Sequence, residues 1–215
     1  MKALCISDIH GKEGFLTAFR NLISERKFDL VLMLGDFVNQ GADVKYFEKF
    51  LNLVEVADLP MFWVPGNNDI GDVYDKMSRS KYSVENKKVE YKGEKIVGMG
   101  GVPDLWGHNI FMPEIKPQEM KDSIFLSHIP PKKFVNFKKF DHDDIQKGVD
   151  LKDAPKIQIS GHQHSYWGVG YIGKTKILKL PAGLNMMVAL LDTESLKVEF
   201  INLIDYNKSN KVILR

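Results

Sequence analysis

Two kinds of hydrophobic pattern alternate over the first third of the chain. Short, almost continuous apolar runs cover residues 2–6, 29–34 and 61–64. Between them, apolar residues recur at helical spacing over residues 12–26 and 43–57. Continuous apolar runs are typical of strands that are buried on both faces. The alternation therefore predicts an α/β protein whose sheet has parallel strands joined by right-handed crossovers.

The rest of the chain has mostly strand patterns. The predicted elements are a short helix over 70–79, a hairpin over 89–97, an irregular loop over 103–117, strands over 123–127 and 157–160, a helix over 141–149, and a β-meander over 169–180, 187–191 and 196–204. We find no repeat, linker or low-complexity tract in the sequence. Residues 1–215 are therefore expected to form a single domain.

Polar side chains that can bind a metal ion follow five of the apolar runs. Asp8 and His10 follow the first run, and their spacing places both on one side of an extended backbone. The complete set is Asp8, His10, Asp36, Asn67, His128, His162 and His164. Because parallel strands end at one edge of a sheet, and sites form beyond that edge, we expect these side chains to meet there.

Each of these residues alone has an ordinary structural explanation, because Asp and Asn are common in turns and a lone His is often structural. Together, seven nitrogen and oxygen ligands exceed what one ion usually takes from a protein. They suit two divalent ions with a bridging carboxylate. Mixed ligands of this kind accept Mn, Fe, Co, Ni or Zn, and the imidazoles disfavour Mg. Two such ions, roughly 3.5–4 Å apart, promote attack on a phosphoryl group.

Composition narrows the class of protein further. The formal net charge of +2 argues against a dedicated polyanion binder. A single cysteine, Cys5, excludes an internal disulfide and a multi-cysteine zinc site, and its apolar surroundings predict a buried hydrophobe. No signal-peptide pattern and no apolar run of membrane-spanning length is present. We therefore expect a cytoplasmic protein without a membrane partner.

The ordered motifs between residues 8 and 164 resemble those of the calcineurin-like metallophosphoesterases. The matching segments are Asp8-Ile9-His10, Gly35-Asp36 with Gly41, Gly66-Asn67-Asn68-Asp69, His128, and Gly161-His162-Gln163-His164. The resemblance implies two packed mixed β-sheets flanked by helices in four layers. It also implies a dinuclear metal-dependent phosphoesterase that acts on a small phosphoester.

The resemblance also implies a role for each matching residue. Asp8, His10 and His164 would hold the first ion. Asn67, His128 and His162 would hold the second, and Asp36 would bridge the two. A hydroxide bridging the ions would then attack phosphorus in line with the leaving group.

One position departs from the family pattern. Where the family has a histidine that contacts the phosphate and assists the leaving group, this chain has Asn68. An amide can donate a hydrogen bond to a phosphate oxygen but cannot deliver a proton near neutral pH, and general acid catalysis contributes roughly a hundred- to ten-thousand-fold. We therefore expect hydrolysis to be retained, with aryl or cyclic diesters favoured over alkyl phosphates. Efficient cleavage of alkyl monoesters would require another acid, for which His108 and His142 are the candidates, although an ordinary surface-loop position is the favoured interpretation of both.

Three other functions are compatible with parts of the sequence. Asn68 allows a binding or scaffold module that keeps the fold but has lost useful turnover. Lysines and phenylalanines over 132–140 resemble single-strand binders and allow a nuclease, although the near-neutral charge disfavours nucleic acid. A purely structural metal site fits poorly, because such sites are usually closed, with four ligands and often cysteine. The sequence does not indicate the substrate, the metal or the oligomeric state.

Overall fold

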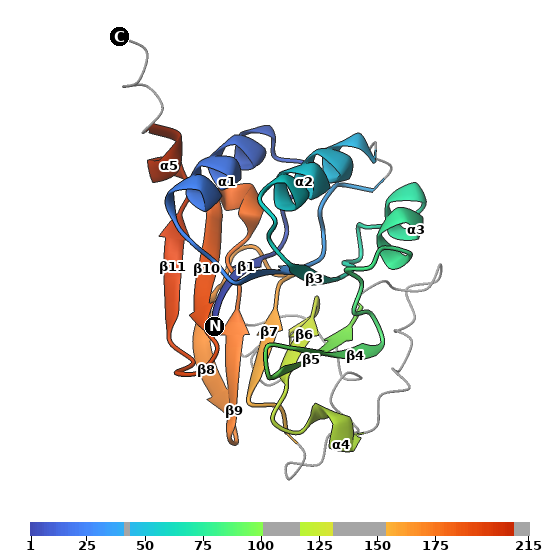
Figure 1. Ribbon diagram of the computed structural model, residues 1–215, viewed down its shortest axis with the longest axis vertical. Coiled ribbons are helices and arrows are strands. Elements are labelled where there is room, and N and C mark those ends of the chain that lie inside the picture. The colour runs from blue at the N-terminus through green and yellow to red at the C-terminus, as the bar shows by residue number, and fades with distance from the viewer. Residues whose placement is uncertain (41–43, 101–116, 131–153, 209–215) are drawn as a thin grey trace.

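The computed structural model describes residues 1–40, 44–100, 117–130 and 154–208. Two mixed β-sheets lie face to face, and helices cover their outer sides (Figure 1). The predicted α/β class and the two packed sheets are confirmed. The predicted helix over 141–149, the lysine-rich stretch over 132–140, and Gly41, His108 and His142 lie outside the described residues, as does nearly all of the predicted loop over 103–117.

The first sheet has five strands in the order β11-β10-β1-β2-β3. Strands β1, β2 and β3 run parallel, as the opening of the sequence predicts, whereas β10 pairs antiparallel with both β1 and β11. The strand bounds are β1 Lys2–Ile6, β2 Leu30–Leu34, β3 Met61–Val64, β10 Met187–Asp192 and β11 Val198–Asn202.

The second sheet has six strands in the order β4-β5-β6-β7-β9-β8. Strands β5, β6, β7 and β9 are parallel, and β4 and β8 are antiparallel edge strands. The predicted hairpin over 89–97 is the β4–β5 pair, with Lys92 and Gly93 at its turn. The strand bounds are β4 Lys87–Tyr91, β5 Glu94–Met99, β6 Ile124–Ser127, β7 Ile157–Ser160, β8 Gly168–Ile172 and β9 Thr175–Lys179.

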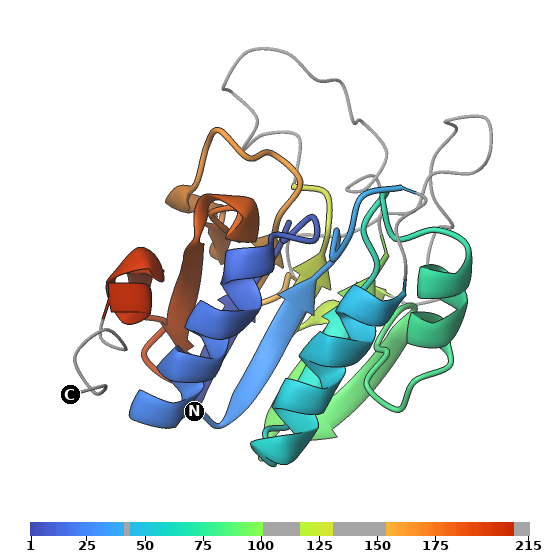
Figure 2. The same ribbon diagram turned by 90° about the horizontal axis from the view of Figure 1, so that it is seen from above.

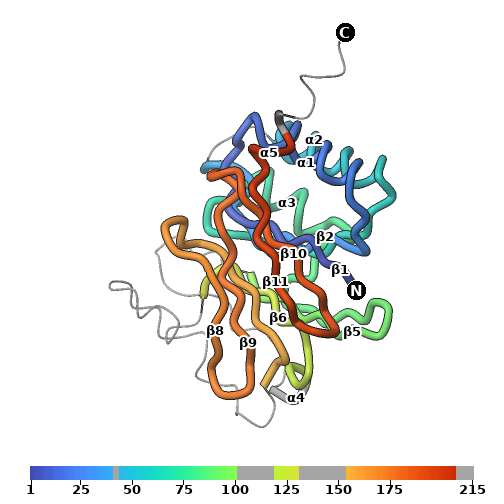
Figure 3. The backbone as a smooth tube through the Cα atoms, turned by 90° about the vertical axis from the view of Figure 1, so that its left-hand side faces the viewer, coloured from blue at the N-terminus to red at the C-terminus, as the bar shows by residue number. Residues whose placement is uncertain are grey.

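The prediction that the C-terminal strands form one β-meander is wrong. The β8–β9 hairpin completes the second sheet, whereas the β10–β11 hairpin belongs to the first (Figure 3). The chain crosses between them through the short 3-10 helix η3, Gly183–Asn185. Backbone hydrogen bonds from Gly183 and Leu184 to the carbonyls of Ser7 and Asp8 hold this crossing at the end of β1.

Helices cover the outer face of the first sheet, where α1 and α2 lie along the strands (Figure 2). A small cluster around Met120 of α4 covers part of the second sheet. Among the described helices, none has the length and apolar character needed to cross a bilayer. The helix bounds are α1 Glu13–Glu25, α2 Lys45–Val56, α3 Asp72–Ser78, α4 Pro117–Met120 and α5 Ile204–Lys208.

Strand β1 shows why the apolar runs are continuous. Leu4 and Ile6 belong to the core beneath the helices, together with Phe15 of α1. Ala3 and Cys5 point the other way, into the core between the two sheets. Both faces of the strand are therefore buried, and Cys5 is the buried hydrophobe that the sequence predicts, with burial raising the pKa of its thiol. This double packing fixes the strand ends from which the site is built.

Candidate metal centre

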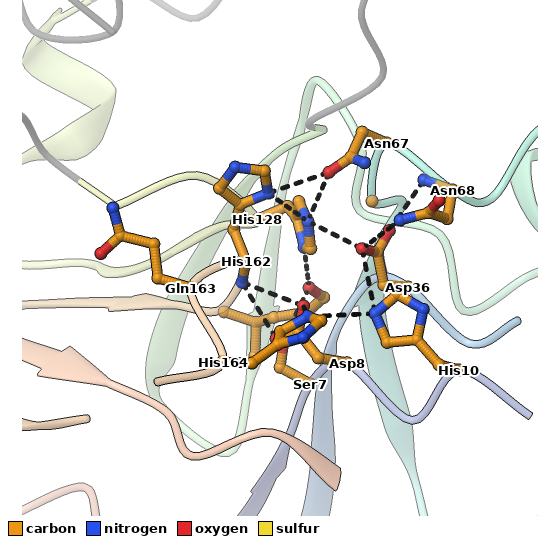
Figure 4. A network of polar contacts seen from close by, with 12 residues as sticks. Ser7, Asp8, His10, Asp36, Asn67, Asn68, His128, His162, Gln163 and His164 are labelled. Carbon is orange, nitrogen blue, oxygen red and sulfur yellow. Dashed lines mark hydrogen bonds and ion pairs between the residues drawn. The ribbon is translucent and has the colours of Figure 1, made fainter. Parts of the chain in front are cut away.

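The loops that follow β1, β2, β3, β6 and β7 converge at one edge of the sandwich, and the predicted ligands meet there (Figure 4). Asp8 and His10 come from the loop after β1, and Asp36 from the loop after β2. The remaining members are Asn67 after β3, His128 after β6, and His162 and His164 after β7. The structure therefore brings together all seven side chains that the sequence singled out.

The first group of ligand atoms consists of Asp8, His10, Asp36 and His164. One ligand atom from each of these residues lies within 4.8 Å of the others, an arrangement that can hold a metal ion. His10 Nε2 lies 3.1 Å from His164 Nε2, and His164 Nε2 lies 3.3 Å from Asp8 Oδ1.

The second group consists of Asn67, His128 and His162. Asn67 Oδ1 lies 3.1 Å from His128 Nε2 and 2.9 Å from His162 Nδ1. The two imidazole nitrogens are 3.3 Å apart. Asn67 Oδ1 carries lone pairs, and each of the two nitrogens carries one in the tautomer that leaves it unprotonated, so the three atoms repel one another unless a proton or a metal cation lies among them.

Asp36 connects the two groups. Its Oδ2 lies 3.5 Å from His10 Nε2 of the first group and 3.4 Å from His128 Nε2 of the second. The carboxylate is almost completely buried. Its position between two sets of nitrogen and oxygen atoms fits the shared ligand of a two-ion centre.

The backbone at the site is unusual in two ways. Asp8, His10, Asp36 and His162 all have positive φ angles, between 50° and 73°, which non-glycine residues rarely adopt and which cluster at functional sites. The loops also touch directly, because a Cβ on Gly66 would lie 2.2 Å from Asp36 Oδ1 and one on Gly161 only 1.7 Å from Ser7 Oγ. Glycine at these two positions therefore permits the close approach of the strand ends.

Hydrogen bonds behind the site orient two of the imidazoles. His128 Nδ1 lies 2.6 Å from the carbonyl oxygen of Leu34, and His10 Nδ1 lies 2.9 Å from Asn39 Oδ1. Each of these oxygens accepts a hydrogen bond from Nδ1–H of the imidazole. In this tautomer Nε2 carries a lone pair, which faces the other ligand atoms. Such outer contacts are typical of metal-binding histidines.

The charges of the site match a cation. Burial opposes the charged form of His128, but the Asp36 carboxylate outweighs burial and raises the pKa of His128 to about 9. Burial likewise opposes the ionised forms of Asp8 and Asp36. The neighbouring histidines and hydrogen-bond donors outweigh it and hold the pKa of both carboxyls below the usual range. The hydrogen bond to Asp8 raises the pKa of His164. The centre thus keeps two carboxylates ionised and draws positive charge toward them.

Asn68 points at Asp36. Its backbone N–H donates to Asp36 Oδ1 over 2.8 Å, and its side-chain Nδ2 donates to Asp36 Oδ2 over 2.7 Å. The amide thus orients the shared carboxylate. Its predicted contact with a phosphate oxygen stays a prediction.

Sequence reasoning assigned no role to Asp69 or Lys179. Asp69 is fully buried and accepts backbone N–H groups from Asp36, Phe37 and Gly66 over 2.7–2.9 Å, so it fixes the loops after β2 and β3. Burial and the charge of Asp36 raise the pKa of Asp69 to about 7. The sequence signal that pointed to Asp69 is its position directly after Asn67-Asn68.

Lys179, at the end of β9, is 3% exposed and donates to the Gln163 carbonyl over 2.9 Å.

Comparison with known proteins agrees with this geometry. The chain matches the calcineurin-like phosphoesterase family over residues 1–166 and therefore belongs to that family, as the motifs indicated. An uncharacterized protein of Methanocaldococcus jannaschii is 25% identical over 199 residues, 83% of this chain and 87% of that protein. A 3′,5′-cyclic adenosine monophosphate phosphodiesterase of Haemophilus influenzae is 29% identical over 62 residues, 28% of this chain and 22% of that protein.

Solved structures share the fold. A Thermus thermophilus protein superposes with a TM-score of 0.66 at 17% identity, covering 94% of this chain and 98% of its own. A dimetal phosphatase of Danio rerio gives 0.60 at 10% identity, and an archaeal phosphodiesterase gives 0.56 at 16%. Both of these matches cover 94% of this chain and 99% of the other. At these identities the likeness shows the architecture alone.

Proposed function

We propose that this protein is a metal-dependent phosphoesterase that uses two divalent ions and prefers phosphodiesters or activated phosphate esters. The observation that carries the proposal is the position of Asp36, whose Oδ2 lies within 3.5 Å of a histidine from each ligand group. Family membership supports the reaction class. Similar proteins include a cyclic-nucleotide phosphodiesterase and, by fold, an archaeal phosphodiesterase, which favours diesters.

Each residue of the centre has a role in this proposal. Asp8, His10 and His164 hold one ion, Asn67, His128 and His162 hold the other, and Asp36 is shared. When bound, the two ions acidify a water molecule and neutralise the phosphoryl oxygens. The metal can be Mn, Fe, Zn, Co or Ni, because imidazole, amide and carboxylate ligands accept all of these.

Hydrogen bonds with the residues behind the ligands fix the orientation of the ligand side chains. The Leu34 carbonyl and the Asn39 amide orient His128 and His10, and Asp69 holds the backbone that carries Asp36. Preorganisation of this kind lowers the reorganisation that the reaction requires.

Asn68 sets the expected substrate preference. It donates two hydrogen bonds to Asp36, and its amide has no proton to give to a leaving group near neutral pH. Good leaving groups, such as phenolates, depart without receiving a proton. Alkyl leaving groups need one, so the enzyme should act poorly on alkyl monoesters.

A turnover comparison tests this function. With Mn²⁺ bound, the protein should hydrolyse a bis-aryl phosphodiester at least about a hundredfold faster than an alkyl phosphomonoester, the lower range of general acid catalysis. His10→Ala should lose both metal and turnover while keeping the circular dichroism spectrum of the parent. Efficient alkyl monoester cleavage would show that another acid acts, and unchanged turnover in His10→Ala would refute the metal centre.

A binding module with this fold is the second candidate, and the observation that favours it is again Asn68. Bound metal with negligible turnover across a broad phosphoester panel would support it. The nuclease alternative rests on residues 132–140, outside the described part of the chain. A single domain, a small phosphoester substrate and a cytoplasmic location stay predictions.

A further inference from the structure

A small pocket adjoins the metal centre on the side of β8. Its volume is about 150 Å³. Among the described residues, its lining includes Pro130, Gln163, Tyr166, Trp167, Val169 and Lys179. None of these side chains is among the proposed metal ligands, so the pocket is a separate surface beside the centre.

The pocket is built on the same two loops as the second ligand group. Gln163 lies between His162 and His164 in the chain, and Pro130 comes two residues after His128. The two loops are joined by a hydrogen bond from the Gly161 N–H to the His128 carbonyl, 2.9 Å long. Figure 4 shows the Gln163 side chain directed away from the ligand cluster, on the outer side of His162. A substrate with its phosphate at the metal centre therefore has this pocket next to it.

The walls of the pocket suit a flat ring. Tyr166 and Trp167 are 50% and 46% exposed, an unusual exposure for such large apolar side chains. The Trp167 ring packs on Phe200 of β11, with ring centroids 4.6 Å apart, so one of its sides is held in place. A cavity of about 150 Å³ accepts one benzene-sized ring. Aromatic side chains in this setting stack on the bases of nucleotides.

Lys179 adds a donor to this otherwise mainly apolar lining. The side chain is 3% exposed, and its ammonium donates to the Gln163 carbonyl over 2.9 Å. An ammonium group can donate three hydrogen bonds. A ring that carries acceptor atoms can accept a further hydrogen bond from this ammonium, whereas a hydrocarbon ring cannot.

We infer that this pocket binds the nucleobase of a nucleotide ester whose phosphate lies at the metal centre. The base stacks against Trp167 and accepts a hydrogen bond from Lys179. This inference rests on the proposed function and narrows its substrate class to phosphoesters that carry a nucleobase.

Two diesters with the same leaving group test the inference. Thymidine 5′-(p-nitrophenyl phosphate) and methyl p-nitrophenyl phosphate both release p-nitrophenolate, so only the retained group differs. With Mn²⁺ bound, the parent should prefer the thymidyl ester by about tenfold or more in kcat/KM, the size that stacking of one base supports. Trp167→Ala should reduce this preference about tenfold, whereas Trp167→Phe, which keeps an aromatic face, should retain most of it.

Tyr171→Ala is the matched control. Tyr171 lies on β8 and is 67% exposed, and it does not belong to the described lining of the pocket. Its removal should leave the preference unchanged. If Trp167→Ala does not fold, Tyr166→Ala provides the second variant, because Tyr166 is also exposed and forms part of the wall.

The outcomes separate this inference from the proposed function. Turnover of both esters at equal kcat/KM would overturn the pocket assignment and leave the phosphoesterase intact. Absence of turnover on both esters would contradict the phosphoesterase. In that case, the binding of thymidine 5′-phosphate to the Mn²⁺-loaded protein, measured by calorimetry, tests the assignment of the pocket. Weaker binding to Trp167→Ala than to the parent would support it, and equal binding would overturn it.

Discussion

The two ligand groups of the centre differ in charge, although each contains both buried and partly exposed side chains. The first group contains the buried carboxylate of Asp8, and its imidazoles reach solvent, with side-chain exposures of 10% for His10 and 36% for His164. The second group has the neutral amide of Asn67 instead of a carboxylate, and its His128 is fully buried. Counting Asp36 in both, the first group has two negative charges and the second has one. The first should therefore bind its ion more tightly.

Removal of the shared carboxylate gives the largest expected effect, because it weakens both groups together. Asp36→Asn should lower turnover of a bis-aryl diester at least about a thousandfold, a loss of several kcal/mol of the charge stabilisation that metal ions supply. Metal content, measured by mass spectrometry after dialysis, should fall for both ions.

Asp58→Asn is the control for this change. Asp58 is exposed and has a φ of 48°, close to the 55° of Asp36, so the substitution is matched in chemistry and in backbone conformation. It should leave metal content and turnover unchanged. A variant at Asp36 that keeps two ions would show that this carboxylate does not connect the groups.

The second prediction concerns the proton that His128 holds in metal-stripped protein. The pKa of His128 in the folded protein, about 9, lies above the ordinary histidine value of 6.5. The contribution to stability is therefore complete below pH 6.5 and is lost as the pH rises toward 9. The loss should amount to about 3 kcal/mol, since one pKa unit corresponds to ~1.4 kcal/mol.

Urea unfolding between pH 6 and 9, in the presence of a chelator, follows this loss. His128→Gln should show a flatter pH dependence than the parent, because this variant lacks the titrating group and keeps the same remaining carboxylates. Mn²⁺ should also flatten the dependence in the parent, because a bound cation replaces the proton. Identical pH dependence in the parent and the variant would contradict the assignment of the proton to His128.

The third prediction sharpens the role of Asn68. Asn68→His restores an imidazole at the position where the family places its proton donor. The ratio of alkyl monoester to aryl diester turnover should rise about a hundredfold, the lower range of general acid catalysis. Asn68→Ala is the matched variant, since it removes the side-chain donor to Asp36 without adding an acid. An equal ratio in both variants would mean that proton delivery does not limit turnover.

The smallest expected effect tests the charge difference directly. Asn67→Asp gives the second group a carboxylate of its own, so the weaker of the two Mn²⁺ dissociation constants should tighten about tenfold. The tighter constant should stay within about twofold, because Asn67 does not belong to the first group. Calorimetric titration of metal-stripped protein separates the two constants, and a change in the tighter one alone would reverse the order assigned here.

Prediction from sequence succeeds where one physical rule decides the outcome. Runs such as residues 30–34 are apolar at every position because both faces are buried, and this predicts parallel strands whose ends meet. The positions of Asp8, His10 and Asp36 follow from that rule. The three site histidines of the second sheet follow because their strands also end at this edge.

Prediction fails where distant partners decide the outcome. The pairing of Leu4 with Leu190 joins β1 to β10, and no local pattern in either segment encodes it. For the same reason the meander was expected to be one unit. Lys179 has the residue type of a surface position, and only the packing of β9 between β7 and β8 buries it. Asp69 resembles an ordinary turn residue until the three N–H groups from two loops are seen around it.

The most direct test of the two-group centre is a stepwise titration. Metal-stripped protein is titrated with Mn²⁺, and bound ions and turnover of bis-p-nitrophenyl phosphate are measured at each addition. Our account predicts two ions per chain, with turnover rising as the second, weaker ion binds. Saturation of both binding and turnover at one ion per chain, or turnover without any metal, would contradict it.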